Sequence, residues 1–279
     1  MTHRPLRFCM VTTFYPPYNF GGDGIFVQRL AHALVARGHQ VTVVHCADAY
    51  RMVGGEAPAV AAPAEDGVTV HTLSSGAGPL SPLVTHQLGV PGFKAPALKR
   101  VLDGGNFDVI HFHNVSLVGG PGVLAYGDGI KLYTAHEYWL VCPLSTLWKF
   151  RAGNCAKKQC VRCTLDAGRP PQWWRYTGQP QRALANVDAL IAPSRFAIDQ
   201  HRVARQQEFT NPLLERLQFV HLDVFITVQA KVHPRLQVPD PGQNLVAHFI
   251  GFNIKKRHQR RLVMALEVGI IEFRVPGVV

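Results

Sequence analysis

The stretch Phe8–Thr13, with the sequence FCMVTT, is followed by Phe14–Pro17 (FYPP) and then by Gly21–Gly24 (GGDG). The apolar run predicts a buried β-strand, and the residues after the glycines show helical spacing of apolar side chains as far as about Arg37. Two adjacent glycines let the backbone approach an anion closely, and the first turn of a helix points free N–H groups at it. The stretch therefore predicts a strand, a phosphate-binding turn and a helix.

The helix is expected to end at Gly38 and to lead into a second strand, Gln40–Cys46, which completes a βαβ unit. Its core-facing positions are expected to be Phe26, Leu30, Ala33 and Leu34. The alternative interpretation is that the glycines only close a tight turn. No Gly-x-Gly-x-x-Gly follows a predicted strand and no Gly-Lys-Ser/Thr motif occurs, which argues against ordinary dinucleotide oxidoreductases and P-loop ATPases.

Strand-like runs alternate with loops or helical patterns along the chain. They are Phe8–Thr13, Gln40–Cys46, Val68–Leu73, Phe107–Phe112, Ile130–Ala135 and Val187–Ala192. Such alternation predicts an α/β fold with a doubly wound parallel sheet, covered by helices on both faces. Ligands of such folds bind beyond the carboxyl ends of the strands.

The composition is that of a globular protein with a sizeable core, since 47% of the 279 residues are hydrophobic and 17% are charged. No apolar run reaches the ~20 residues of a membrane-spanning helix, and Met1–Pro5 leads into the first strand without a signal sequence. We therefore expect a cytoplasmic location, with peripheral membrane contact left open. The formal net charge of +11 favours acidic partners such as nucleotide diphosphates and anionic lipid head groups.

Three histidines stand at strand ends, within His111–Asn114 and His136–Glu137. Because the carboxyl ends of parallel strands meet at one edge, we expect these imidazoles to converge there. An imidazole at this edge can hydrogen-bond a sugar hydroxyl or a diphosphate oxygen near neutral pH, in either protonation state. A structural role is the alternative for any one of them. Their shared position favours a functional group, with His136 as the main candidate.

Four of the six cysteines cluster as Cys142, Cys155, Cys160 and Cys163, in the spacing C-x12-C-x4-C-x2-C. The count of four and the final C-x2-C suit a tetrahedral structural zinc site. Reduced, buried cysteines and redox chemistry are the alternatives, and disulfides are disfavoured in a cytoplasmic chain. Four thiolates would leave no open coordination position, so such a zinc would fold its loop rather than catalyse.

These motifs occur in the order seen in one enzyme family. The glycine pair, the histidine-bearing strand ends, Cys142-Pro143 and the turn Ala192–Phe196 together resemble the amino-terminal half of a GT-B glycosyltransferase of the retaining family-four type. The segment Gly38–Val43 matches the helix-to-strand turn of that family. The resemblance covers roughly residues 6–200, and its motifs are individually loose but collectively specific.

The resemblance implies a two-domain enzyme of polysaccharide or glycolipid assembly. The amino-terminal domain would hold the acceptor, and a second Rossmann-like domain would hold the nucleotide-sugar. It implies that Gly21 and Gly22 contact the donor diphosphate and that His136 is the catalytic residue, lying against the donor sugar. Acceptor or cleft positions would be His111, His113, Asn114, Glu137 and Ser194. Most members need no metal for transfer, and some relatives share the cysteine cluster, which makes a structural role the expected one.

The second half departs from the family pattern. We divide the chain into a glycosyltransferase amino-terminal domain at 1–200 and a partial or divergent donor-domain fragment at 201–279. Only Phe249–Leu266 resembles the first strand, loop and helix of a donor domain, and there Lys255 or Lys256 would bind the donor phosphate. No Glu-x7-Glu pair follows to hold the donor sugar. We therefore expect the 279-residue chain to transfer sugar poorly or not at all.

Three functions compete at this point. The first is transfer of a sugar from a nucleotide-sugar donor to a saccharide or lipid-linked acceptor, impaired by the missing segment. The second is a non-catalytic remnant that binds an acceptor or a partner protein. The third, a zinc module for nucleic acid near Trp173–Tyr176, is disfavoured because the one basic run, Lys255–Arg261, is more typical of a solvated helix face.

Overall fold

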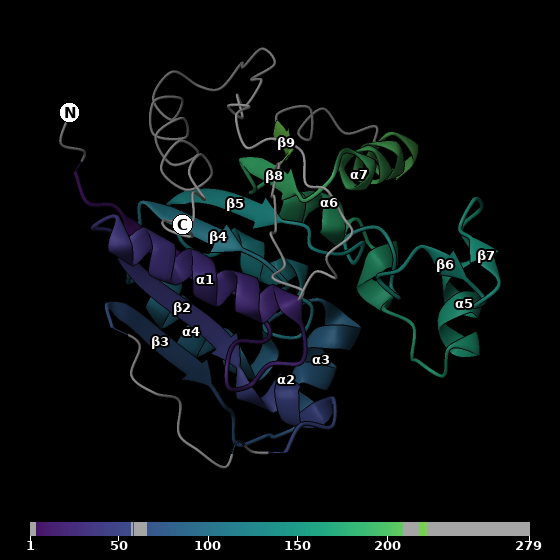
Figure 1. The fold of residues 1–279 in the computed structure, drawn as a ribbon. Coiled ribbons are helices and arrows are strands. Elements are labelled where there is room, and N and C mark those ends of the chain that lie inside the picture. The colour runs from purple at the N-terminus through teal and green to yellow at the C-terminus, as the bar shows by residue number, and fades with distance from the viewer. Residues whose placement is uncertain (1–3, 57, 59–65, 209–217, 222–279) are drawn as a thin grey trace, which may run out of the picture.

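A computed structural model describes residues 4–56, 58, 66–208 and 218–221 of the chain. Its centre is a seven-stranded sheet in the order β3-β2-β1-β4-β5-β8-β9 (Figure 1). Every neighbouring pair is parallel. The strands are β1 (Arg7–Val11), β2 (Gln40–Cys46), β3 (Val68–Leu73), β4 (Val109–Phe112), β5 (Ile130–Thr134), β8 (Ala189–Ala192) and β9 (Gln218–His221). The predicted doubly wound parallel sheet is confirmed.

Helices lie on both faces of this sheet (Figure 1). The α-helices are α1 (Gly22–Ala36), α2 (Ala47–Met52), α3 (Leu80–Leu88), α4 (Ala95–Leu102), α5 (Cys160–Asp166), α6 (Gln179–Leu184) and α7 (Arg195–Glu208). Three 3-10 turns are η1 (Gly92–Lys94), η2 (Pro121–Ala125) and η3 (Trp173–Tyr176). One apolar core lies between α1 and the sheet, and a second fills the opposite face under α2, α4, α6 and α7. None of the described helices is long and apolar enough to cross a membrane.

Helix α1 packs on the sheet through a stripe that shares two of its residues with the predicted one. The stripe begins at Val27 and continues at the spacing i+3, i+4 and i+7 through Leu30, Ala31 and Leu34. Leu30 and Leu34 were expected there, whereas Phe26 and Ala33 are only half-buried. The ring of Phe26 packs partly against the core under α1 and also edge-on against His136, with ring centroids 5.0 Å apart. A residue predicted to lie in the core thus also contacts the site.

The strand order fixes where a ligand can bind. From β1 the chain proceeds to β2 and β3 on one side and then crosses to β4 on the other side of β1. In sheets of this kind, ligands bind where the strand order reverses, which here is at the carboxyl ends of β1 and β4. The glycine turn follows β1, and the histidines follow β4 and β5. All of them therefore lie at this edge.

The sheet continues past the boundary that we predicted after residue 200. That boundary falls inside α7, which ends at Glu208, and β9 pairs with β8 from Gln218 to His221. The first domain thus extends at least to β9. The rest of the predicted donor-domain fragment, with Lys255 and Lys256, lies outside the described residues.

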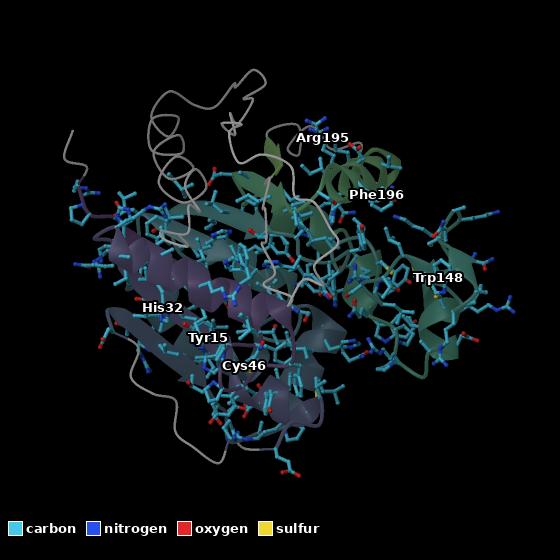
Figure 2. The ribbon with its side chains drawn as sticks, viewed as in Figure 1. Tyr15, His32, Cys46, Trp148, Arg195 and Phe196 are labelled. Atoms are coloured by element: carbon cyan, nitrogen blue, oxygen red, sulfur yellow. The ribbon has the colours of Figure 1, made fainter. Side chains whose placement is uncertain are left out.

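A small module stands out from the body of the domain (Figure 1). It comprises residues 142–167, and we call it the cysteine module. It contains the short antiparallel hairpin of β6 (Trp148–Lys149) and β7 (Gly153–Asn154), followed by α5. Figure 2 labels Trp148, whose side chain is largely exposed, on this hairpin. Thr164 is the one buried residue between positions 141 and 170, so the module has no apolar core of its own.

Candidate functional site

The glycine turn forms the open amino terminus of α1. Gly21 is the N-cap in extended conformation, and Gly22 is the first helical residue. Within the described part of the chain, the N–H groups of Gly21 and Gly22 make no hydrogen bond. A Cβ added at Gly22 would have no heavy atom within 4 Å, so this backbone faces open space. Free N–H groups at a helix amino terminus are a ready site for an anion.

Gly24 has a different role from the glycine pair. A Cβ at Gly24 would lie 2.2 Å from Asn19 Oδ1 and 2.9 Å from the carbonyl oxygen of Phe14. Glycine is therefore needed there for packing of the turn against its own helix. The structure thus separates a structural glycine from the two glycines that face outward.

Asp23 joins α1 to the end of β4. Its Oδ1 accepts the N–H of Gly24 at 2.9 Å, and its Oδ2 accepts the side-chain amide of Asn114 at 3.3 Å. Asn114 Oδ1 in turn accepts from the N–H and the hydroxyl of Ser116. Asn114 therefore lies at the carboxyl edge of the sheet, where it fixes the first turn of α1 against the loop after β4. A carboxylate in the first turn also stabilises the helix dipole.

The three histidines form one row along the edge. His111 Nε2 lies 2.7 Å from Thr134 Oγ1, and His113 Nδ1 lies 3.1 Å from His136 Nε2. The ring centroids of His111 and His113 are 4.1 Å apart, and those of His113 and His136 are 5.3 Å apart. His111 and His113 are buried, whereas His136 is half-buried at the mouth of the row. The structure brings the three residues together as predicted.

Burial keeps these imidazoles neutral. It lowers the pKa of His111 to about 3 and the pKa of His113 well below its usual value, and the neighbouring imidazoles lower both further. Burial also lowers the pKa of His136, partly opposed by the negative charge of Asp23. Near pH 7 the three imidazoles are therefore neutral. The sequence alone had left both the neutral and the protonated form open.

The neutral pair restricts which nitrogen of His136 carries the proton. His113 Nε2 is buried and has no partner among the described residues. If His136 donated to His113, that nitrogen would be a buried N–H without an acceptor, which costs about 1–3 kcal/mol. Buried donors are orphaned more rarely than acceptors. We therefore assign the donor role to His113 Nδ1, which leaves His136 an N–H at Nδ1 for a ligand.

Glu137 and Ser194 differ in what they offer a ligand. Burial raises the pKa of Glu137, while the hydroxyl of Ser145 hydrogen-bonds the carboxylate and opposes the shift. Ser194 accepts the N–H of Ala197 at 3.1 Å and so acts as a cap at the start of α7. Its hydroxyl is exposed but already has this structural role.

The four cysteines of the module share one neighbourhood. None is in a disulfide, and all are half-buried. Burial raises the pKa values of Cys155 and Cys160, and the negative charge of a Cys142 thiolate raises both further. No group of three or more His, Cys, Asp or Glu side chains in the described part of the chain is placed to hold a metal ion. Zinc binding by these thiols stays a prediction.

A cavity at the opposite sheet edge is an alternative site. It has a volume of about 250 Å³ and lies at the amino ends of β4 and β5, where Asp103, Asp108 and Asp128 line it. Two of the carboxylates hold the fold together, because Asp108 accepts the N–H of Arg7 and Asp103 accepts that of Gly127. Three carboxylates repel an anionic ligand, so this cavity does not suit a diphosphate.

Sequence reasoning missed two residues of the site. Asp23 was read only as part of the glycine turn, and Phe26 was assigned to the core. The position of Asp23 in the first helical turn, a preferred place for acidic residues, could have indicated its role. Nothing in the periodicity separates Phe26 from a core residue, because one rotation of the helix by 100° decides between the two.

Comparisons with known proteins identify the family of this chain. The family model described as Glycosyltransferase Family 4 matches residues 20–207, which include the glycine turn, the histidine row and the cysteine module. An uncharacterized 42.6 kDa protein in the cps region of Klebsiella pneumoniae is 27% identical over 213 residues. That alignment covers 70% of this chain and 51% of the relative, so the chain spans about half the length of the curated relative it matches.

Two solved structures also match part of this chain, both with TM-scores below 0.5. Sucrose-phosphate synthase from Thermosynechococcus elongatus has 17% sequence identity and a TM-score of 0.43, with 78% of this chain and 47% of that one covered. AviGT4, a glycosyltransferase involved in avilamycin A biosynthesis, has 14% identity and a TM-score of 0.27, with 78% and 64% covered. Because the family model matches well over half of its residues, the chain belongs to glycosyltransferase family 4.

Proposed function

We propose that this chain takes part in the transfer of a sugar from a nucleotide-sugar to a saccharide or lipid-linked acceptor. The observation that carries the proposal is the meeting of two groups at one sheet edge. The N–H groups of Gly21 and Gly22 at the amino terminus of α1 have no partner among the described residues, and the half-buried His136 lies against Phe26 of the same helix. One group suits a diphosphate and the other suits a sugar.

The diphosphate would lie over the N–H groups of Gly21 and Gly22. These donors are fixed by the helix before any ligand arrives, so they stabilise negative charge on the leaving group without reorganisation. Asp23 carries a charge that opposes an anion, but Gly24 and Asn114 already engage its two oxygens. The N–H groups of the glycine pair, rather than the side chain of Asp23, therefore set the position of the diphosphate.

His136 would hydrogen-bond the sugar through its outer N–H. The proton on Nδ1 follows from the hydrogen bond with His113, and the lowered pKa keeps the ring neutral at the pH of the reaction. A neutral imidazole holds a hydroxyl without adding a cation beside the oxocarbenium character of a glycosyl transition state. The role of His136 is thus to orient the sugar, with His113 fixing its tautomer.

A calorimetric titration with a panel of nucleotide-sugars tests the proposal. We expect at least one to bind the wild-type chain, and His136→Gln to weaken that binding by about threefold to tenfold, as expected for one hydrogen bond of about 1 kcal/mol. His32→Gln, on the exposed side of α1 (Figure 2), is the matched control and is expected to bind as the wild type does. Absence of binding by every member of the panel would contradict the proposal.

A further inference from the structure

The carboxyl end of β3 borders a cavity that the site above does not use. The cavity has a volume of about 500 Å³ and is lined by residues 73–77, Phe93, Lys94 and Ala97. We call it the β3-end cavity. It lies at the same sheet edge as His136, since the strands are parallel, and β3 is three strand spacings from β4, about 14 Å.

Lys94 is a buried cation in the wall of this cavity, with only 2% of its surface exposed. Its Nζ donates to Ser81 Oγ and Thr85 Oγ1, both at 3.0 Å. An ammonium has three N–H groups, and the third has no partner among the described residues. Nor does any described carboxylate lie within ion-pair distance of Lys94. Burial lowers the pKa of Lys94, with Cys46 and Asp48 opposing the shift.

A purely structural role does not account for this charge. The two hydroxyl contacts tie η1 to α3, and a neutral donor such as a glutamine amide could make them. A buried ammonium without a counter-ion is costly compared with a neutral group. An anion that entered the cavity would supply both the counter-charge and the third hydrogen-bond partner.

Asp48 is not within ion-pair distance of Lys94, although its charge partly opposes the lowering of the Lys94 pKa. Its Oδ2 accepts the N–H and the hydroxyl of Ser75 at 2.7 and 2.8 Å, and its Oδ1 accepts the hydroxyl of Ser74 at 3.1 Å. Arg51 also lies 3.4 Å from Asp48 and from Ser74. The carboxylate thus fixes the Ser74–Ser75 loop and forms an ion pair with Arg51, so the charges of Asp48 and Arg51 offset each other.

The remaining walls suit a sugar ring. A Cβ added at Gly76 would have no heavy atom within 4 Å, so the loop backbone borders open space. The side chain of Phe93 is 54% exposed and offers an apolar face, with Leu73 and Ala97 beside it in the lining. A pocket with apolar walls and a few placed polar groups is typical of small-molecule sites.

We propose that the β3-end cavity binds an anionic group of the acceptor, a carboxylate or a phosphate carried on a sugar, through Lys94. This inference rests on the proposed function, since it names the class of acceptor that would bind at the same sheet edge. Because the cavity is several strands from His136, the anionic group lies on a part of the acceptor remote from the reacting hydroxyl. Binding energy from such a remote group can be used to position the reacting one.

The test is an NMR titration of the full chain, without donor, with glucuronate, glucose 6-phosphate and glucose. We expect at least one of the two anions to shift the backbone amides of Ser74–Ala77, and to bind at least about tenfold more tightly than glucose, the gain of a charged hydrogen bond. The anion with the larger effect identifies a carboxylate or a phosphate. Lys94→Gln should abolish the preference over glucose, whereas Lys99→Gln, on the exposed surface of α4, should retain it.

Two outcomes would overturn the inference. One is equal binding of glucose and both anions by the wild type, and the other is anion-induced shifts confined to residues outside the β3-end cavity. The wild-type titration decides even if Lys94→Gln does not fold. The two proposals can fail separately. If the chain binds a nucleotide-sugar but neither anion, only the proposed acceptor class is wrong. If it binds an anion in the β3-end cavity but no nucleotide-sugar, only the proposed donor is wrong.

Discussion

At the scale of single residues, the site depends on which glycines face outward. We predict that Gly22→Ala leaves the free energy of unfolding within about 0.5 kcal/mol of wild type, because its Cβ meets open space. Gly24→Ala should lower that free energy by about 1–3 kcal/mol, because its Cβ would overlap Asn19 and Phe14. Urea unfolding of both variants measures the difference. Equal destabilisation by the two substitutions would contradict the assignment of their roles.

The same two variants should separate binding from stability. Gly22→Ala places a methyl group where the diphosphate is proposed to approach, so we expect weaker nucleotide-sugar binding despite a normal fold. The comparison is made by calorimetry at a temperature where both variants are folded. Unchanged affinity in Gly22→Ala would show that the diphosphate does not contact this turn.

The buried histidines predict loss of stability in acid. The folded-state pKa values of His45 and His111 are about 4 and about 3, lowered by burial, whereas an unfolded histidine titrates near 6.5. As the pH falls below about 6.5, the unfolded chain binds protons that the folded chain does not, so unfolding becomes easier. The loss continues down to the folded-state pKa, at up to about 1.4 kcal/mol per pH unit for each histidine.

Urea unfolding at pH 7 and pH 5.5 measures this dependence. His111→Asn should be less stable than wild type at pH 7, because the hydrogen bond to Thr134 and packing are lost. Its further loss between the two pH values should be smaller by up to about 1.4 kcal/mol. An identical pH dependence in the two proteins would show that His111 titrates normally in the folded state.

At the scale of elements, the cysteine module lacks the apolar core that would hold it together. A segment of this size usually needs a disulfide or a metal to fold stably. We predict that protein purified without chelator contains about one zinc per chain, bound by the four thiols of the module. We assign this zinc no role in catalysis, because four thiolates would fill its coordination sphere.

Metal analysis by mass spectrometry tests this prediction. Cys160→Ser should lose the zinc and make the module more susceptible to proteolysis, while Lys157→Ala, an exposed change in the same module, should retain both properties. A metal-free wild-type protein in which the module resists protease as well would rule out the zinc site.

The elements also show how far the sequence determines the fold. The strands β2 and β3 agree with the predicted bounds, because β-branched residues bordered by turn residues mark both of them. β9 was not predicted, since a strand of four residues, Gln218–His221, carries little periodicity. Only two of the four predicted core positions of α1 are buried. Apolar periodicity defines the width of a buried stripe better than the side of the helix on which it lies.

The candidate site was predictable to the extent that it depends on topology. Parallel strands place their carboxyl ends together, which was enough to predict that His111, His113 and His136 converge. The pairing of nitrogens and the neutral state of the row depend on burial, which only the structure supplies. Lys94 could not be predicted, because its importance depends on its burial and on the lack of a carboxylate within ion-pair distance among the described residues.

At the scale of the whole molecule, all of the proposed chemistry lies at one edge of the sheet. The glycine turn, the histidine row and the β3-end cavity follow strands β1, β4, β5 and β3, whose carboxyl ends point the same way (Figure 1). The other edge carries Asp103, Asp108 and Asp128, which disfavour an anion. The central claim is therefore directional: a nucleotide-sugar binds at the carboxyl edge and not at the amino edge.

Hydrogen–deuterium exchange of the full chain, with and without a nucleotide-sugar identified by calorimetry, tests this claim most directly. The account predicts slower exchange at residues 20–26, 113–116 and 136–139 when the ligand is bound, since these segments surround the glycine turn and His136. It predicts no change at residues 103–108 and 127–130, which border the acidic cavity at the opposite edge. Protection of the acidic edge with no change at the glycine turn would contradict the account.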